Sequence, residues 1–298
     1  MDDAGSSLTP LAGGWSGRTF LGEAGGERVV VRLYPPDDPR GPEAPEVDQA
    51  VLHLVRGLLP VPDVLEVRRP RPGTGEPGLL VTGWLPGERG DVVVGRLEGE
   101  EDADGLRRLG GSMGTVAATL AGMPVRRPGT FLDAELALGD LPDVDLPEWA
   151  DHRLAGWSSE ERGALAEVAR DAQDLLDTVG RASLVHSDLN PKNVLVGPGS
   201  LVVTAVLDWE FAHAGHPWTD VGNLLRFERH PAYVEGVLAA WTGLRGGTAE
   251  DLLDGARAAD LWALVDLAAR AGDNPVADRA AVLVRAVADS GDLHAWPF

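Results

Sequence analysis

The pattern of hydrophobic and polar positions makes the first part of the chain rich in strands. Two β-branched and aromatic runs, 18–23 and 28–34, flank a Gly-rich turn and predict an antiparallel hairpin. Apolar residues at helical spacing follow in 46–59, and two further strand-like runs occupy 61–67 and 78–84. We therefore expect an antiparallel sheet accompanied by one helix.

Beyond residue 85 the pattern becomes helical. Residues 104–123 and 158–180 carry apolar side chains at the helical period, and Ser158 with Glu161 forms a capping box at the start of the second segment. Alanine-rich helical segments recur from 231 to 290. The exception is a pair of short strand-like runs, which lie on either side of a Gly-Pro-Gly-Ser hairpin near residue 198.

These elements predict an α+β fold with two lobes. Residues 1–85 would form an N-terminal lobe of antiparallel sheet with one helix, and residues 86–298 a larger, mainly helical lobe. A chain of 298 residues with 44% hydrophobic content can bury a sizeable core. Two short acidic stretches, 98–105 and 139–149, are expected to be solvated loops.

A group of polar residues interrupts the first of the two strand-like runs. His186, Asp188 and Asn193 lie in this interruption, and Asp208 ends the second run, so that hairpin geometry would bring them together. One carboxylate could accept a proton, while an Asn and a second carboxylate could hold a hard cation. Phosphoryl transfer needs this equipment. The alternative is that Asp188 and Asn190 only form Asx-turns and Asn193 caps a strand.

The His-x-Asp-x₄-Asn spacing, with Asp208 following Asn193, resembles the aminoglycoside phosphotransferase and choline kinase superfamily, which has the protein-kinase-like fold. The resemblance covers nearly the whole chain. It implies that Asp188 is the catalytic base, that Asn193 and Asp208 are Mg²⁺ ligands, and that His186 stiffens the catalytic loop. It also implies that Asp220 is a buried carboxylate that holds this loop through its backbone.

The same resemblance places a nucleoside triphosphate, ATP or GTP, against the N-terminal lobe. Gly14, Ser16 and Gly17 would cover the phosphates with backbone N–H groups and one hydroxyl. The main-chain groups of Thr82 and Trp84 would bind the adenine or guanine base. The glycine pattern departs from the Gly-x-Gly-x-x-Gly of protein kinases and has little specificity by itself.

Two cations complete the expected nucleotide site. Arg32 stands where protein kinases have lysine, and a guanidinium there can clamp the phosphates. Its helix partner would be Asp48, or Glu46 if the register slips, unless these are simply surface ions. Lys192, the one lysine of the chain, would point towards the transferring phosphoryl group, and a solvated lysine at a turn is the alternative.

The charge of the chain narrows the classes of partner. The net charge of −21 disfavours nucleic acid, because it repels a phosphate backbone. No apolar stretch is long enough for a membrane span and no signal-like segment opens the sequence, so we expect no membrane partner and a cytoplasmic location. The absence of cysteine excludes thiolate chemistry.

The segment from Asp208 to Asp220 is too short to hold the activation segment with which protein kinases bind peptides, so a small-molecule acceptor is expected. Residues 86–298 carry a net charge of −17, which favours a cationic, hydroxyl-bearing acceptor. Aminoglycosides are the first hypothesis, and basic peptide antibiotics such as viomycin or capreomycin the second. The acids expected to bind such an acceptor are Glu210, Glu228, Asp260 and Asp266.

Two alternatives remain open. A small-metabolite kinase acting on choline, a sugar or an amino alcohol would use the same catalytic loop with fewer acids around the acceptor. A catalytically inactive relative would bind the nucleotide or a cationic ligand without turnover. Assays of nucleotide turnover with and without cationic antibiotics would separate these hypotheses.

Overall fold

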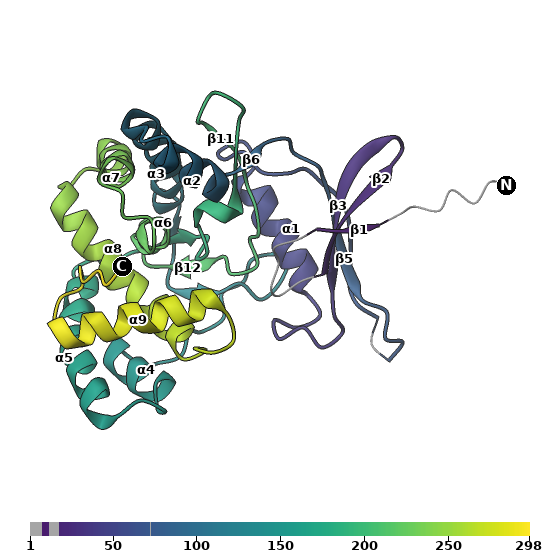
Figure 1. Cartoon of the computed structure of the whole chain (residues 1–298). Helices are drawn as coiled ribbons and strands as arrows, with labels where there is room; N and C mark the ends of the chain where they lie inside the picture. Colours follow the sequence, from purple (N-terminus) through teal and green to yellow (C-terminus); the bar gives the residue numbers. More distant parts are fainter. Residues whose placement is uncertain (1–7, 12–17, 72) are drawn as a thin grey trace.

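The computed structural model describes residues 8–11, 18–71 and 73–298. An antiparallel sheet with one helix stands beside a larger helical part, as the sequence predicted (Figure 1). The sheet has the strand order β1-β2-β3-β5-β4. Its strands are β1 (Thr9–Pro10), β2 (Arg18–Ala24), β3 (Glu27–Tyr34), β4 (Val64–Arg68) and β5 (Gly78–Gly83). The predicted residues Gly14, Ser16 and Gly17 lie outside the described residues.

The helix of this part, α1 (Ala44–Val55), packs against β4 and β5. Its buried face includes Val51, Leu52 and Val55, which share one side at the helical period. The helix ends earlier than its apolar pattern, because Arg56 leaves helical geometry and Gly57 adopts a positive φ of 84°. Glycine tolerates that conformation without the steric cost that a side chain would bring.

Helices form most of the remaining chain. They are α2 (Gly90–Gly99), α3 (Ala103–Ala121), α4 (Leu146–Arg153), α5 (Ser159–Asp177), α6 (Thr219–Leu225), α7 (Pro231–Arg245), α8 (Ala249–Ala268) and α9 (Pro275–Ser290). The predicted capping box at the start of α5 is confirmed, since Ser158 accepts from the Glu161 backbone and Glu161 from the Ser158 backbone.

The two acidic stretches were wrongly expected to be loops throughout. The first contains the end of α2, whose Val93, Val94 and Leu97 are buried. The second contains the start of α4, where the Asp145 carboxylate accepts a hydrogen bond from the Glu148 backbone and caps the helix. The acids of these two stretches therefore lie at the ends of helices as well as in the loops between them.

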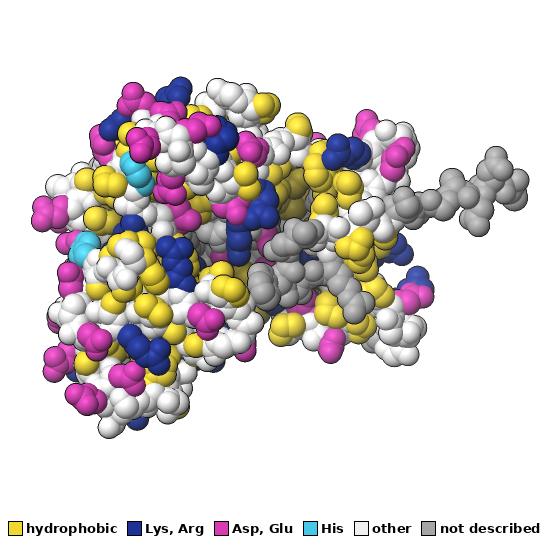
Figure 2. Space-filling model, in the orientation of Figure 1, with side chains coloured by type: hydrophobic (Ala, Val, Ile, Leu, Met, Phe, Trp, Pro, Cys, Tyr) yellow, Lys and Arg dark blue, Asp and Glu magenta, His cyan; other side chains and the backbone are white. Residues whose placement is uncertain are grey.

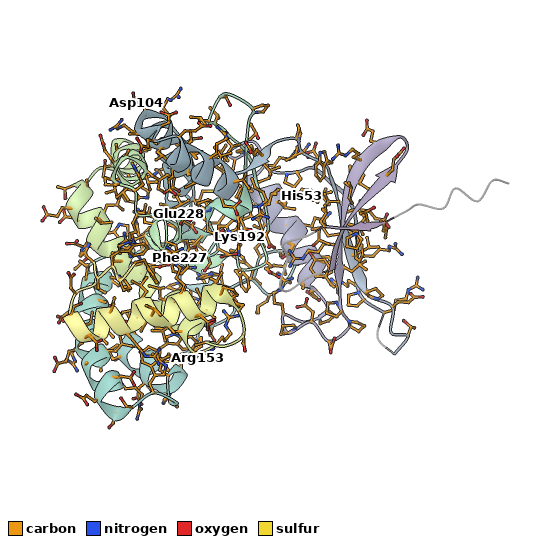
Figure 3. All side chains as sticks on the ribbon, in the orientation of Figure 1. His53, Asp104, Arg153, Lys192, Phe227 and Glu228 are labelled. Atoms are coloured by element: carbon orange, nitrogen blue, oxygen red, sulfur yellow. The ribbon has the colours of Figure 1, made fainter. Side chains whose placement is uncertain are left out.

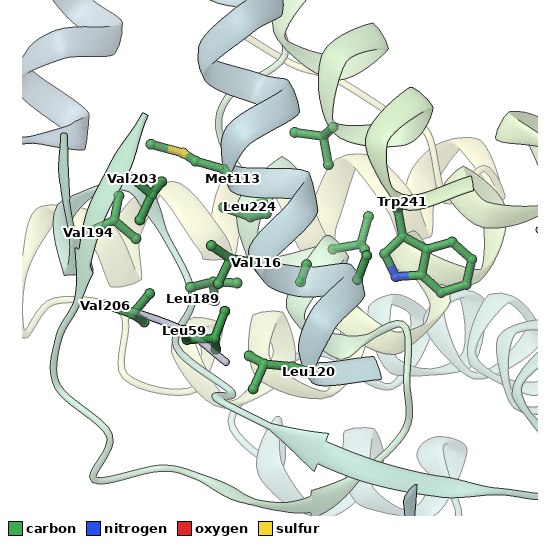
Figure 4. Packing of buried hydrophobic residues seen from close by; sticks show 14 of the residues in the cluster. Leu59, Met113, Val116, Leu120, Leu189, Val194, Val203, Val206, Leu224 and Trp241 are labelled. Carbon is green, nitrogen blue, oxygen red and sulfur yellow. The ribbon is translucent and has the colours of Figure 1, made fainter. Parts of the chain in front are cut away.

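Helices α3 and α7 come into backbone contact in the centre of the helical part. A Cβ atom on Gly110 would lie 2.3 Å from the Tyr233 carbonyl oxygen, and one on Gly236 would lie 2.1 Å from the Arg107 carbonyl oxygen. Around this contact, buried side chains of α3 such as Met113 and Val116 pack together with Val194, Val203 and Val206 (Figure 4). These three residues belong to the hairpin predicted near residue 198, residues 194–206, which is called the catalytic hairpin below. The core thus supports the loop that carries the predicted chemistry.

Two small sheets position that loop. One has the order β11-β10-β6 and the other β7-β9-β12-β8. Their strands are β6 (Glu88–Arg89), β7 (Pro124–Val125), β8 (Gly129–Thr130), β9 (Ala182–Val185), β10 (Val194–Val196), β11 (Val203–Val206) and β12 (His213–Gly215). A one-turn 3₁₀ helix, Pro191–Asn193, precedes β10.

Candidate active site

A cleft of about 330 Å³ lies between the sheet and the catalytic hairpin. One side of its wall contains Arg32 and Thr82 of the sheet, Asp48 of α1, and Trp84, which follows β5. The hairpin side contains the predicted Lys192, Asn193 and Asp208. The structure therefore brings seven of the predicted residues to one cleft.

Hairpin pairing explains why two distant polar residues meet there. Strand β10 pairs with β11 in the antiparallel register Val194 to Val206. The Leu207 backbone N–H then donates to the Asn193 carbonyl at 2.8 Å, which sets Asp208 beside Asn193. Asp208 itself has a positive φ of 64°, an uncommon backbone conformation for a residue other than glycine.

Asp220 holds the catalytic loop as predicted. It is fully buried, and its two carboxylate oxygens accept hydrogen bonds from the backbone N–H groups of His186, at 3.0 Å, and Ser187, at 2.9 Å. Ser187 needs this support because its φ is 65°. Burial raises the pKa of Asp220, while His186 and the two backbone donors act in the opposite direction.

His186 is buried and stiffens the same loop. Its Nε2 lies 2.8 Å from the Leu207 carbonyl, and its Nδ1 accepts from the Asp188 backbone N–H at 3.3 Å. These two contacts select the tautomer with the proton on Nε2. The ring also packs on Trp209, with 4.7 Å between ring centroids. His186 therefore joins the catalytic loop to the strand end that carries Asp208.

The Asp188 carboxylate is oriented by two amides. Asn190 donates to Oδ1 and Asn193 to Oδ2, both at 2.7 Å. Lys192 places its ammonium 3.9 Å from Oδ2. The Asp188 side chain keeps 23% of its surface exposed, so a ligand can still approach it. An ionised carboxylate with fixed orientation and solvent access is suited to accept a proton from a hydroxyl.

Asn193 and Asp208 offer oxygen atoms for a hard cation. Both side-chain hydrogen bonds of Asn193 run from its Nδ2 to Asp188, which leaves its amide oxygen for a ligand. Among the residues that the structure describes, no group of three or more His, Asp or Glu side chains forms a metal cage. Two protein oxygens nevertheless fit Mg²⁺, which usually takes its remaining ligands from water and substrate phosphates.

The predicted ion pair between Arg32 and Asp48 is wrong, as is its alternative with Glu46. The Arg32 guanidinium instead donates to the carboxylates of Asp208 and Glu210, from β3 across the cleft. Burial would lower the pKa of Arg32, but Asp208 and Glu210 are among the groups that raise it above its usual range.

Asp48 and Glu46 have other arginine partners. Arg40 donates to Asp48 at 2.7 Å, and the Tyr34 hydroxyl donates to the same carboxylate at 2.7 Å. Glu46 pairs with Arg69 on the surface. Arg40 lies in a loop between the sheet and α1, so its approach to Asp48 depends on how that loop folds back.

The strand end expected to bind the base lines the same cleft. Thr82 is buried in β5, between β3 and β4. The Trp84 backbone N–H donates to the Arg28 carbonyl at 3.2 Å, and the Arg28 guanidinium stacks over the Trp84 ring at 4.1 Å. The Trp84 N–H is thus engaged, and its carbonyl remains the main-chain group for a base at this residue.

The four acids proposed to bind a cationic acceptor do not form one site. Asp260 is wrong for this role, because it is 1% exposed and bound to Arg226 through Nε and Nη2. Asp266 pairs with Arg153 and Arg270 instead.

The other two acids also have environments that do not suit this role. Glu210 binds Arg32. Burial raises the pKa of Glu228 to about 7. None of these environments presents a free carboxylate cluster to a cation.

A match to a family model places the chain among known proteins. The model of the phosphotransferase enzyme family, which includes the aminoglycoside phosphotransferases, matches residues 7–253. The chain belongs to the phosphotransferase enzyme family. This membership confirms the superfamily that the spacing of His186, Asp188, Asn193 and Asp208 indicated.

Solved structures show that the phosphotransferase shares its fold with aminoglycoside kinases. The GDP complex of aminoglycoside 2'-phosphotransferase-IIIa superposes with a TM-score of 0.70, 17% identity and coverage of 97% of this chain and 95% of that one. A thermostable mutant of APH(4)-Ia with ADP and hygromycin B gives a TM-score of 0.65, 18% identity and coverage of 96% and 94%. The bilobal α+β prediction is thereby confirmed.

A curated relative matches only a segment of the phosphotransferase. Mouse acyl-CoA dehydrogenase family member 11 is 39% identical over 59 residues, which are 20% of this chain and 8% of the mouse protein.

Among the described residues, every helix is too short or too polar to cross a lipid bilayer.

Several residues that shape the site were missed from the sequence. Asn190 was expected at most to form an Asx-turn, and it does accept from the Lys192 backbone N–H at 3.1 Å, but its role in orienting Asp188 was missed. Asn223 accepts from the Leu189 backbone N–H at 3.3 Å and donates to Asp260 at 3.2 Å. A hydrogen-bonded chain therefore runs from Arg226 and Asp260 to the catalytic loop, and no local pattern marks its distant members.

Proposed function

We propose that this phosphotransferase moves the γ-phosphate of ATP or GTP to a hydroxyl of a small molecule. The observation that carries the proposal is the Asp188 carboxylate, which the amides of Asn190 and Asn193 hold, while Asn193 itself lines the cleft together with Asp208. The family match and the nucleotide complexes of proteins with the same fold support it.

Asp188 is proposed to act on the acceptor. Its carboxylate accepts the proton of the acceptor hydroxyl as the new bond between oxygen and the γ-phosphorus forms and the bond to the β-phosphate oxygen breaks. Asn190 and Asn193 fix the carboxylate before the substrate arrives, so less orientation is needed in the transition state. Lys192 adds positive charge beside the transferred group.

Asn193 and Asp208 are proposed to hold Mg²⁺, and Arg32 to contact the nucleotide phosphates. When bound, the metal neutralises charge on the β- and γ-phosphates. In the structure the Arg32 guanidinium supplies the positive charge beside Asp208. Thr82 and Trp84 are proposed to contact the base, and Gly14, Ser16 and Gly17 the phosphates. The need for a nucleoside triphosphate favours a cytoplasmic location.

The acceptor class is the finer part of the proposal. The charge of residues 86–298 predicts a cationic antibiotic as the acceptor, whose phosphorylation would give resistance. Solved proteins of this fold include a hygromycin B complex. The ion pairs of Asp260 and Asp266 remove two of the four acids on which that prediction depended. Choline, a sugar or an amino alcohol remains the alternative, as does an inactive relative.

Transfer of radiolabel from γ-labelled ATP and GTP tests the proposal directly. The wild-type protein is incubated with Mg²⁺ and with cationic, neutral and anionic hydroxyl-bearing compounds, and with EDTA in place of Mg²⁺ as the control. We expect labelled acceptor only with Mg²⁺. If the protein binds the nucleotide but neither labels an acceptor nor hydrolyses the nucleotide, the inactive relative is the correct description.

A further inference from the structure

Arginines gather at the end of α6, the helix whose Asn223 accepts from the Leu189 backbone N–H of the catalytic loop, in a chain whose net charge is −21. Arg226 ends α6, Arg229 follows it, Arg257 belongs to α8 and Arg279 to α9. Arg226 is neutralised by its buried ion pair with Asp260. The other three, Arg229, Arg257 and Arg279, are called the arginine cluster below.

The arginine cluster lacks the carboxylate partners that other arginines of the chain have. Within the described ranges, none of its three guanidinium groups has a carboxylate oxygen within 4.0 Å. Arg257 is 5% exposed and donates from Nη1 to the Leu225 carbonyl, while its buried Nε has no hydrogen-bond partner. Arg229 donates to the Arg226 carbonyl at 3.4 Å. A buried donor without a partner is unfavourable, because it has lost its hydrogen bonds to water.

Aromatic rings hold two of these guanidinium groups in place. Arg279 lies over the rings of Phe227, Trp296 and Phe298, at 4.7, 5.4 and 4.8 Å. Arg229 lies over Trp296 at 4.7 Å. Stacking on a ring engages the face of a guanidinium and leaves its N–H edge for a planar or tetrahedral oxyanion.

The positive charge is only partly compensated here, because the carboxylate that raises the pKa of Arg229 and Arg257 is that of Asp260, which is already paired with Arg226. Burial, together with the charge of Arg229, lowers the pKa of Arg257 to about 9. Burial also lowers the pKa of Arg229 to about 10, to which the charge of Arg279 contributes. Glu228 is near Arg279 and Arg226 but forms no ion pair with either among the described contacts. An anion among these groups would reverse the unfavourable interactions.

The position of the arginine cluster relates it to the acceptor rather than to the nucleotide. None of its residues lines the cleft that contains Arg32, Thr82 and Asp208. Burial would lower the pKa of the neighbouring Arg226, but the charges of Asp260 and, to a smaller extent, Asp188 raise it. Arg226 is therefore close enough to Asp188 to feel its charge.

The figures place the same region on the helical part. Phe227 and Glu228 are labelled on the helical part, where Figure 3 shows them towards its middle. Figure 2 shows dark-blue side chains beside yellow ones in the middle of this face.

We propose that the arginine cluster binds an anionic group, a carboxylate or a phosphate, on the hydroxyl-bearing acceptor. The inference rests on the proposed function. It gives the acceptor a negative charge, whereas the net charge of the chain predicts a positive one. Net charge counts every acid of the chain alike, whereas Arg229 and Arg257 are fixed at the end of α6 by the Arg226 and Leu225 carbonyls, without an ion pair of their own among the described residues. Local, buried charge decides binding because exposed charge is screened by salt.

Paired acceptors test the sign of this charge. ω-Hydroxy carboxylates of increasing length are compared with their neutral amides, with glycerol 3-phosphate, and with hygromycin B and choline as cations. A charged hydrogen bond contributes roughly 1.5 to 3 kcal/mol, so kcat/KM for an anion should exceed that for its amide by about 10-fold to 100-fold. The better of carboxylate and phosphate identifies the anionic group. Equal rates with the amides, or a preference for a cation, would overturn the inference.

Variants on one helix provide the matched control. Arg279→Gln should lower kcat/KM for the anionic acceptor at least about 10-fold and leave the amide unchanged. Arg285→Gln should change neither, because Arg285 also stacks on a tryptophan of the helical part but is paired with Glu161. Equal losses in the two variants would count against a specific anion site.

A binding measurement decides the question even without turnover. Phosphate and succinate are titrated calorimetrically into the protein saturated with ADP and Mg²⁺. Binding that is lost in Arg229→Gln supports the inference, and no binding of either anion to the wild type overturns it. Nucleotide binding and Asp188-dependent hydrolysis, measured on the same samples, report separately on the proposed function.

Discussion

Replacing Asp260 by Asn should destabilise the protein far more than the replacement of an exposed acid would. The carboxylate and its partner Arg226 have side-chain exposures of 2% and 8%, and three hydrogen bonds join them. Removing one member of such a buried pair leaves the other charge without compensation, which costs about 3 to 5 kcal/mol. We therefore expect Asp260→Asn to lower the free energy of unfolding by that amount.

The same substitution should also reach the catalytic loop. Asp260 accepts from Asn223, which in turn accepts from the Leu189 backbone N–H next to Asp188. Urea unfolding followed by tryptophan fluorescence measures the stability, and initial rates at a temperature where the variant is folded measure kcat. We expect kcat to fall while nucleotide affinity is retained.

Two controls make the result specific. Asp266→Asn removes an acid of the same helix whose pairs with Arg153 and Arg270 are exposed, so it should cost about 1 kcal/mol or less. The double variant Arg226→Met with Asp260→Leu removes both buried charges and should recover most of the lost stability. An Asp260→Asn protein as stable as the wild type, with only a raised acceptor KM, would refute this reasoning and restore Asp260 as an acceptor ligand.

Two further substitutions have defined outcomes. Lys192→Met should lower kcat about fivefold with little change in acceptor KM, because one partly exposed cation contributes about 1 kcal/mol. An unchanged kcat in steady-state assays would make Lys192 a solvated residue. Glu228 has a pKa raised by burial to about 7 from 4.5, so the folded protein keeps a proton that the unfolded chain loses. Wild-type stability should therefore fall relative to Glu228→Gln as the pH rises from about 5 to 8, by at most about 3 kcal/mol, and a difference independent of pH in urea unfolding would contradict the assigned burial.

The sequence predicted the elements whose signal is local. The hairpin around Gly25 and the capping box at Ser158 depend on neighbouring residues, and both are present. Helix α4 was missed because acidic residues surround Leu146 and Ala150, the buried positions that define its inner face. A short helix with so few apolar positions gives too little periodicity to separate it from a loop.

The site shows the same distinction. Asp188, Asn193 and Asp208 are close in sequence, and the pairing of one hairpin brings them together. The partner of Arg32 depends instead on how β3 faces the end of β11, a contact across 176 residues of chain. Counting charge over the helical part likewise concealed the arginine cluster, because its members come from three separate segments.

The most direct test of the account compares Asp188→Asn with Asp208→Ala for both kcat and nucleotide affinity. Asp188→Asn should reduce phosphate transfer by about 10²-fold to 10⁴-fold and leave the Kd of the Mg²⁺ nucleotide nearly unchanged, because it alters the proton acceptor alone. Asp208→Ala should remove the dependence of nucleotide affinity on Mg²⁺. Transfer by Asp188→Asn within threefold of wild type, or Mg²⁺-dependent nucleotide binding by Asp208→Ala as tight as in the wild type, would contradict the assigned roles.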